Sequence, residues 1–261
     1  MKKVNVAVVG ASGYMGEEVV RLLLRHPQVN LTRITSRTYA GQRIGQVFPR
    51  YYEADLCFSN PDVEDIAANA SIAFLALPHG TAAEYALPLV EKGVKVIDVS
   101  ADFRLDDPDV YEEYYGLPHP CPEWLPKAVY GLAERNRDAI RGADIIACPG
   151  CYPTSILLPL TALMHAGLVR PDGIVVSSMS GVTGAGRKAD VALLFAECNE
   201  SLRPYKVTMH RHISEIEQEL TKAASEKVVL NFIPHLVPVN RGIHTTILAN
   251  AAVEDVTPEK I

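Results

Sequence analysis

The sequence lacks a long hydrophobic run. No stretch of its 261 residues approaches the roughly 18 consecutive apolar residues of a membrane-spanning helix. The short apolar run near the N-terminus follows Lys2 and Lys3, but Gly10, Ser12 and Gly13 break it at once, which argues against a signal peptide. We therefore expect a cytoplasmic protein that does not enter a membrane.

The sequence also lacks long basic runs and has few cysteines. Lys and Arg form no long run, and the net charge of −6 argues against broad binding to nucleic acid or to an anionic membrane surface. Cysteine is scarce, and five residues, an odd number, argue for reduced thiols rather than a secreted disulfide framework. This composition still permits local basic pockets for small anions.

The first half of the chain alternates short apolar runs with amphipathic segments. Residues 4–10 form a β-branched run typical of a strand buried on both faces of a parallel sheet, and residues 17–26 have helical spacing that Pro27 ends. Such alternation predicts a doubly wound, Rossmann-type parallel sheet in a domain spanning residues 1–149. The other elements expected in it are strands near 31–36, 72–78, 94–100 and 143–150, and a helix at 81–93.

After Cys151 the pattern changes. The expected strands are longer and more alternating, which predicts an antiparallel or mixed sheet in a second, α+β domain spanning residues 150–261. No linker, internal repeat or low-complexity tract separates the halves, so the boundary is placed by pattern. The elements expected here are helices at 156–168 and 214–225, and strands at 173–181, 228–239 and 242–253.

A glycine turn joins the first strand to the first helix. Its glycines have G-x-x-G-x-x-G spacing, which lets the backbone approach a pyrophosphate held at the helix N-terminus. This is not the strict G-x-G-x-x-G fingerprint, and a tight turn without a ligand is the alternative, but the strand-turn-helix context favours a dinucleotide site. We expect the cofactor to contact Gly10, Ser12, Gly13, Tyr14, Met15 and Gly16.

The second strand indicates which dinucleotide. Ser36 and Arg37 lie about 20 residues past the last glycine, where an NAD-selective protein usually carries Asp or Glu. A hydroxyl followed by a guanidinium suits a 2′-phosphate, so we predict NADP. A surface arginine at a strand end is the alternative reading.

The stretch ACPGCYPTS carries the candidate nucleophile. Pro153 is favoured in a first helical turn, so a helix should begin within a residue or two of Cys151. That position lowers a thiol's pKa and offers backbone N–H groups to an oxyanion, which both serve acyl transfer. Cys148, before Pro149, fits a buried thiol. A redox disulfide between the two cysteines stays open, although Pro153 and an NADP-type domain are not part of a thioredoxin pattern.

A second candidate cluster is HRHISEIE. Ser214 and Glu217 fit a capping box, which predicts a helix start at Ser214 and an extended loop that points His210 and His212 to one side. Histidine titrates near neutrality, so this loop could supply a proton-transfer partner for the thiol, with Glu215 orienting one imidazole. Surface histidines near a helix start are the alternative. A zinc site would need a second C-x-x-C or a histidine pair at ligand spacing. His210 and His212 could supply such a pair, so a metal site is a further alternative, but we predict none.

Together these motifs resemble the N-acetyl-gamma-glutamyl-phosphate reductases, a family related to aspartate-semialdehyde dehydrogenase. The resemblance runs from the first strand nearly to the last residue, and the P-G-C-Y-P-T and H-R-H-x-x-E-I motifs are its specific parts. The motifs that carry it are GASGYMGEE, TSRTYAG, LALPHG, DVSADFRL, YGLAERNR, CPGCYPTS, SGVTGAGRKA, HRHISEIEQEL and PHLVPVNRGIHTT.

The resemblance implies NADPH-dependent reductive dephosphorylation of N-acetylglutamyl 5-phosphate to N-acetylglutamate 5-semialdehyde, in arginine biosynthesis. Cys151 would form a thioester that accepts hydride. His212 would be the acid/base, oriented by Glu215 and supported by His210, although the residues alone do not rank the two histidines. A related acyl phosphate (aspartyl phosphate, or carrier-bound glutamyl or aminoadipyl phosphate), or a silent NADP-binding module, is the alternative.

The resemblance also implies further contacts and an assembly. Family members continue beyond a point like Ile261, so we expect a C-terminally truncated second domain, and we expect homo-oligomers, dimers or tetramers, through its sheet. Position 214 is Ser where relatives often carry Pro. The expected cofactor contacts are Pro78, Ser180, Gly181 and Gly184. The expected substrate contacts are Arg187, Tyr205, Arg211 and Arg104, with Arg241 a further candidate, and structural salt bridges are the alternative for Arg104 and Arg241.

Overall fold

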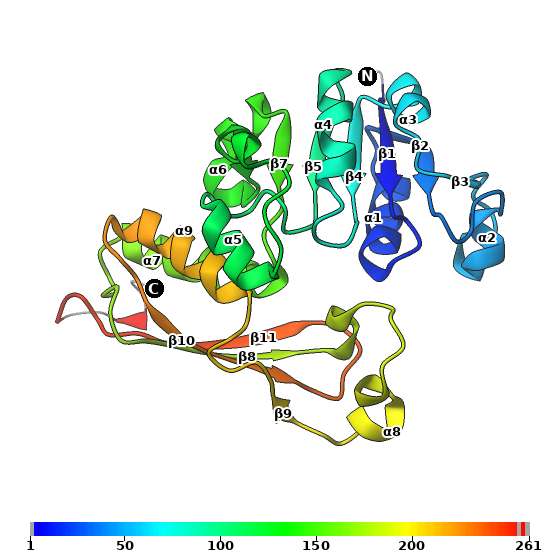
Figure 1. Cartoon of the computed structure of the whole chain (residues 1–261). Helices are drawn as coiled ribbons and strands as arrows, with labels where there is room; N and C mark the ends of the chain where they lie inside the picture. The colour runs from blue at the N-terminus through cyan, green and yellow to red at the C-terminus, as the bar shows by residue number, and fades with distance from the viewer. Residues whose placement is uncertain (1–2, 255–256, 259–261) are drawn as a thin grey trace. The chain divides into compact units, whose positions relative to one another are not determined.

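The computed structural model describes residues 3–254 and 257–258, and the chain divides into two compact units (Figure 1). The first contains the described residues up to Asp109 together with Leu117–Pro149. The second contains Val110–Gly116 and the described residues from Gly150 onward. The division after Pro149 lies where the sequence pattern places a domain boundary, whereas the pattern gives no sign that residues 110–116 join the second unit.

The first unit is built on a seven-stranded sheet in which every pairing is parallel. Its order is β3-β2-β1-β4-β5-β7-β6, so the predicted doubly wound parallel sheet is confirmed. The strands are β1 (Val4–Val9), β2 (Val29–Thr35), β3 (Phe58–Ser59), β4 (Ile72–Leu75), β5 (Lys95–Asp98), β6 (Ala128–Tyr130) and β7 (Ile145–Ala147).

Helices cover both faces of this sheet, because β1 is apolar on both sides. Ala7 and Val9 pack in a core with α3 and α4, while Val6 and Val8 pack in a second core with α1 and α2. The helices of this region are α1 (Tyr14–Arg25), α2 (Ile44–Val47), α3 (Val63–Asn69), α4 (Ala83–Glu91) and α6 (Ala133–Gly142), with short 3₁₀ turns at Pro49–Tyr51 and Pro122–Lys127. Helix α5 (Pro108–Tyr115) begins in this unit, but its residues from Val110 onward belong to the second unit.

The glycine turn is tightly packed at its two ends. Gly10 has φ of +83°, a left-handed conformation, and a Cβ there would overlap the Ala76 carbonyl oxygen. A Cβ on Gly16 would overlap the Gly10 carbonyl oxygen. Helix α1 begins at Tyr14, earlier than the expected residue 17, because the turn between Gly10 and Gly13 is completed within the motif itself.

The second unit is built on a four-stranded mixed sheet with the order β11-β8-β10-β9, which confirms the expected mixed sheet. β8 and β10 are parallel, and β11 and β9 run antiparallel to them. Helices α7 and α9 pack together on one face (Figure 1). The elements are α7 (Cys151–His165), β8 (Ile174–Ser180), α8 (Phe195–Cys198), β9 (Arg203–Pro204), α9 (His212–Ala224), β10 (Leu230–Leu236) and β11 (Ile243–Leu248), with 3₁₀ turns at Val182–Ala185 and Val191–Leu193.

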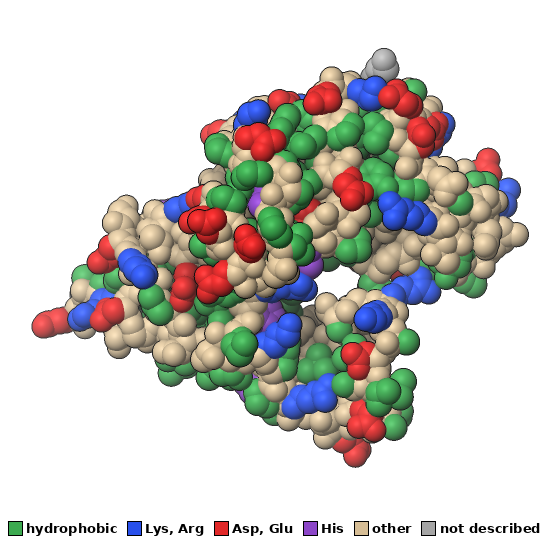
Figure 2. All heavy atoms as spheres, in the orientation of Figure 1, with side chains coloured by type: hydrophobic (Ala, Val, Ile, Leu, Met, Phe, Trp, Pro, Cys, Tyr) green, Lys and Arg blue, Asp and Glu red, His purple; other side chains and the backbone are tan. Residues whose placement is uncertain are grey.

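Several apolar side chains of this unit are exposed. Around α8, Val191, Leu194 and Phe195 are largely accessible, and Figure 2 shows hydrophobic side chains at the surface there. On β8 and β11, Met179 and Leu248 are exposed, at positions that alternate with the buried residues of β8. No helix among the described residues combines the length and apolar character needed to cross a membrane.

A glycine substitution tests this account of the first turn. We expect Gly16→Ala to lower the free energy of unfolding by about 1–3 kcal/mol, because the new Cβ must displace the Gly10 carbonyl. Gly142→Ala is the matched control. It ends α6, and a Cβ there would have no described atom within 4 Å, so stability should hold or rise by up to about 1 kcal/mol. Urea denaturation of both variants measures this, and a Gly16→Ala protein as stable as its parent contradicts it.

Candidate active site

Cys151 is the first residue of α7. Gly150 is the N-cap, with extended backbone at φ −62° and ψ 160°, and its carbonyl accepts the Thr154 N–H at 2.9 Å. The residue Cys151 is exposed, and Pro153 lies in the first turn. The expected helix start beside this thiol is confirmed, so the thiol lies where the helix macrodipole favours negative charge.

Glu215 and His212 pack directly on this helix start. The Glu215 side chain is buried, and its Oε1 accepts the Gly150 N–H at 2.8 Å. A Cβ placed on Gly150 would lie 2.6 Å from His212 Nε2 and 3.0 Å from Glu215 Oε2. Only glycine leaves room for both groups, so the chain brings Glu215 and His212 to the residue that precedes Cys151.

His210 is a buried member of the same cluster. Its Nδ1 accepts the backbone N–H of His212 at 3.1 Å, and its ring centroid lies 4.8 Å from that of His212. Burial lowers the pKa of His210 to about 4, and the charges of Arg211 and Lys206 act in the same direction. His210 is therefore neutral near pH 7, with its proton on Nε2 because Nδ1 is an acceptor.

Two tyrosines complete the wall around His210. The Tyr152 ring lies edge-on to it at 5.3 Å and the Tyr205 ring at 5.6 Å, and the two hydroxyls are 3.0 Å apart. Burial raises the pKa of both phenols, so they remain protonated. They can donate and accept hydrogen bonds, but they do not supply charge.

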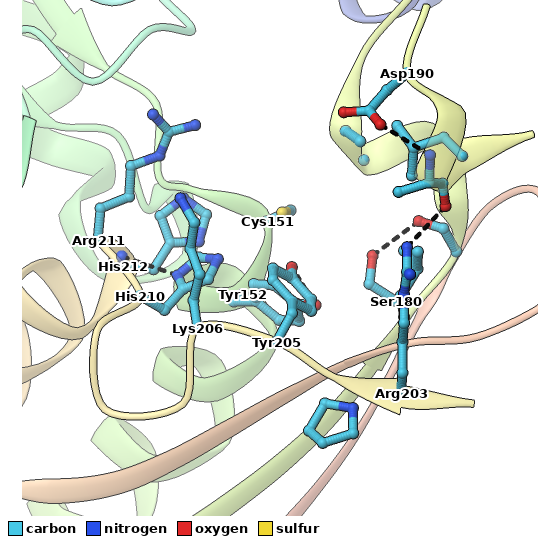
Figure 3. Close-up of a pocket in the computed structure, with 17 residues that line it drawn as sticks. Cys151, Tyr152, Ser180, Asp190, Arg203, Tyr205, Lys206, His210, Arg211 and His212 are labelled. Carbon is cyan, nitrogen blue, oxygen red and sulfur yellow. Dashed lines mark hydrogen bonds between the residues drawn. The ribbon is translucent and has the colours of Figure 1, made fainter. Parts of the chain in front are cut away.

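Cys151, the two histidines and the two tyrosines line a pocket of about 720 Å³ in the second unit (Figure 3). In the view, Cys151, the histidines and the tyrosines stand on one side, and Ser180, Arg203 and Asp190 stand on the other. The lining includes three cationic side chains, Arg203, Lys206 and Arg211, and one carboxylate, Asp190. This charge suits an anionic ligand.

The helix start expected at Ser214 is wrong. Helix α9 begins at His212, with Arg211 as its N-cap residue in a helical rather than extended conformation. The capping box does not form, because Ser214 Oγ donates to the Arg211 carbonyl at 2.9 Å and Glu217 accepts the Leu230 N–H at 3.1 Å. The histidines still lie together, since the helical turn replaces the expected strand-like alternation.

The residues predicted to contact substrate or nicotinamide fall into three groups. Besides Cys151 and the histidines, the pocket is lined by five of them: Ser180, Gly181, Gly184, Tyr205 and Arg211. Arg187 and Arg241 are exposed and lie outside the set of lining residues. Arg104 is buried in the first unit, where its guanidinium donates to the carbonyls of Cys148 at 2.7 Å and Val99 at 2.8 Å, a structural use of the side chain.

Sequence reasoning missed four of the polar or aromatic residues that line the pocket: Tyr152, Asp190, Arg203 and Lys206. The position of Tyr152 could have indicated its role, because it directly follows the candidate nucleophile Cys151 in the expected first turn of the helix. The other three lie between β8 and α9, where no periodic pattern in the sequence predicts which side chains face inward.

In the first unit, the glycine turn leaves room at the start of α1. Gly13 is the N-cap, and a Cβ there would have only the Gly10 carbonyl oxygen, at 3.7 Å, among described atoms within 4 Å. Ser12 Oγ lies 2.8 Å from Ser36 Oγ, which joins this turn to the end of β2. Arg37 follows, and its Nη2 donates to Tyr85 Oη at 2.8 Å. A hydroxyl pair and a held guanidinium beside an open helix N-terminus fit the phosphate groups of a dinucleotide.

Comparison with known proteins identifies the family. Residues 5–143 match the family model for the semialdehyde dehydrogenase NAD binding domain, and residues 151–261 match that for the semialdehyde dehydrogenase dimerisation domain. An N-acetyl-gamma-glutamyl-phosphate reductase from Akkermansia muciniphila is 60% identical over 253 residues, which cover 95% of this chain and 73% of that protein. The chain belongs to the N-acetyl-gamma-glutamyl-phosphate reductase family.

Other comparisons agree with this membership. The reductase from Nitrosococcus oceani is 46% identical over 94% of this chain and 72% of its own length. Among solved structures, aspartate semialdehyde dehydrogenase II of Vibrio cholerae complexed with ASA matches with a TM-score of 0.73 and 20% identity. The match covers 97% of this chain and 76% of the dehydrogenase chain. Aspartate semialdehyde dehydrogenase with NADP from Candida albicans has a TM-score of 0.67 at 16% identity, and the match covers 98% of this chain and 74% of that one. These structures share the fold of the reductase chain.

A substitution at Gly150 tests the packing of this reductase site. Gly150→Ala should reduce reductase kcat/KM by about tenfold or more, because the added Cβ pushes the His212 imidazole and the Glu215 carboxyl away from the start of α7. Alanine adopts the φ and ψ of Gly150 without strain, so a loss of kcat/KM is attributed to the contact of the new Cβ with His212 and Glu215. Gly142→Ala again serves as the control, and unchanged kcat/KM in Gly150→Ala contradicts the arrangement.

Proposed function

We propose that this chain catalyses the NADPH-dependent reductive dephosphorylation of N-acetylglutamyl 5-phosphate to N-acetylglutamate 5-semialdehyde, a step of arginine biosynthesis. The observation that carries the proposal is the exposed Cys151 at the start of α7, with His212 and Glu215 packed on the preceding glycine. Membership of the reductase family supports the choice of substrate.

The chemistry begins at the thiol. The Cys151 thiolate attacks the acyl carbon, the bond to the phosphate oxygen breaks, and inorganic phosphate leaves a thioester on sulfur. Backbone N–H groups in the first turn of α7 have no intrahelical acceptor by helix geometry, and they can stabilise the oxyanion that forms. The cationic pocket lining favours both the acyl phosphate and the released anion.

The two histidines take different roles in this proposal. His210 stays neutral, and its Nδ1 is already engaged by the His212 N–H, so it supports the turn that carries His212. His212, with Nε2 directed at the start of α7, is the acid/base: it takes the thiol proton when sulfur attacks the acyl carbon, and it gives a proton back to the sulfur when the reduced adduct releases the aldehyde. Glu215 acts as a positioning residue, because it ties α9 to the Gly150 N–H.

The cofactor is proposed to be NADP, held by the first unit. Gly10, Gly13 and Gly16 would carry the pyrophosphate at the start of α1, with Ser12, Tyr14, Met15 and Pro78 beside it, while Ser36 and Arg37 would bind the 2′-phosphate. When bound, the cofactor supplies the hydride that reduces the thioester. Ser180, Gly181 and Gly184, which line the pocket that also contains Cys151, stay predicted cofactor contacts.

The second unit is also proposed to mediate homo-oligomerisation. Its family model is described as a dimerisation domain, and α7 and α9 cover one face of its sheet. Met179 and Leu248 are exposed on the strands, so a second copy could cover this apolar surface.

The nucleophile is tested in the reverse direction. Phosphate-dependent reduction of NADP by N-acetylglutamate semialdehyde should fall by more than about 1,000-fold in Cys151→Ala and also in Cys151→Ser. Cys148→Ala is the matched control: burial raises the pKa of Cys148 to about 11, so it does not supply the reactive thiolate, and the activity should be largely kept. Undiminished turnover in Cys151→Ala would rule out the mechanism.

The preference for NADP is tested by binding. Arg37→Gln should weaken NADPH binding about tenfold, because a charge-assisted contact to the 2′-phosphate is lost, and should leave NADH binding unchanged. Arg33→Gln is the control, because Arg33 lies on β2, just before Arg37 in the chain, but is paired with Asp65. Fluorescence titration with both nucleotides measures this, and equal losses for NADPH and NADH contradict a 2′-phosphate role.

A further inference from the structure

The boundary between the two units falls within helix α5. Pro108 and Asp109 belong to the first unit, whereas Val110–Gly116 belong to the second. Tyr111 is fully buried, and its ring stacks on that of Tyr115 with centroids 4.7 Å apart and planes at 16°. The stacking fixes the Tyr115 ring, since an aromatic pair in this geometry adds to the burial of its members.

Tyr115 contacts a residue of the pocket. The guanidinium carbon of Arg211 lies 5.5 Å from the Tyr115 ring centroid, within the range of a cation–π interaction. Arg211 is the N-cap residue of α9, next to His212, and it lines the pocket with Cys151. Figure 3 shows its side chain extending beside the two histidines.

An arginine that binds a substrate anion benefits from being held in advance. Its side chain has many rotamers, and the loss of this freedom weakens binding unless the free protein has already restricted the side chain. A ring face restricts the guanidinium without neutralising it and without occupying its N–H donors, unlike a carboxylate partner.

We propose that Tyr115 is a positioning residue that holds the Arg211 guanidinium for an oxyanion of the substrate. The inference rests on the proposed function, because the anions in question are the phosphate and the carboxylate that the acyl phosphate carries. Segment 110–116 thus supplies a part of the substrate site from a helix whose beginning belongs to the nucleotide-binding unit.

The test compares Tyr115→Leu with Tyr115→Phe in the reverse reaction. Phenylalanine keeps the ring face and should behave like the parent, whereas leucine should raise the KM for one anionic substrate about three- to tenfold, with kcat within about twofold. The substrate whose KM rises, phosphate or semialdehyde, identifies the anion that Arg211 contacts. The KM for NADP should not change. Equal KM values in the leucine variant and the parent overturn the proposal.

A double-mutant cycle separates this role from simple packing of α5. In an Arg211→Gln background, Tyr115→Leu should have no further effect on the same KM. A full additional loss shows that the ring acts independently of Arg211 and overturns the proposal. Thermal unfolding of each variant reports any loss of stability separately.

A readout without turnover distinguishes failure of this inference from failure of the proposed reaction. Inorganic phosphate or N-acetylglutamate, bound in the pocket, should protect Cys151 from iodoacetamide. Tyr115→Leu should weaken that protection about three- to tenfold and Tyr115→Phe should not. Equal protection in all variants overturns the positioning role even if the chain proves to catalyse another reaction.

Discussion

The hydrogen bond from the Gly150 N–H to Glu215 Oε1 joins the two helices on which the active site depends. It ties the N-cap of α7 to the first turn of α9 at 2.8 Å, and Glu215 is only 1% exposed. A buried hydrogen bond to a carboxyl is costly to break, at about 1.5–3 kcal/mol if the group is charged. Because Cys151 begins one helix and His212 the other, this contact holds together the two helix starts that carry the thiol and the imidazole.

The electrostatic character of the pocket follows from what surrounds that contact. Two tyrosine rings and Phe232 enclose His210, so burial keeps it neutral and leaves its Nδ1 to accept the His212 N–H. Its neutrality keeps a further positive charge out of the pocket. The positive charge comes instead from Arg203, Lys206 and Arg211, which are placed to attract an anion.

Local signals predicted much of this molecule. Buried runs alternating with helices gave the parallel sheet, and Pro153 located the start of α7, because both depend on residues close in sequence. The start of α9 could not be obtained this way, since the Glu217 carboxyl bonds the Leu230 N–H rather than capping its own helix. The place of Tyr115 beside Arg211 is likewise a tertiary contact that no periodicity indicates.

The proposed mechanism requires acylation of one thiol. Incubating the protein with freshly prepared N-acetylglutamyl 5-phosphate, without nucleotide, should release one equivalent of phosphate per chain. Mass spectrometry of the digested protein should find one N-acetylglutamyl group on the peptide at Cys151, because the thioester has no reductant to consume it. An adduct on another residue, or phosphate release with the Cys151 thiol still unmodified, would contradict the central claim.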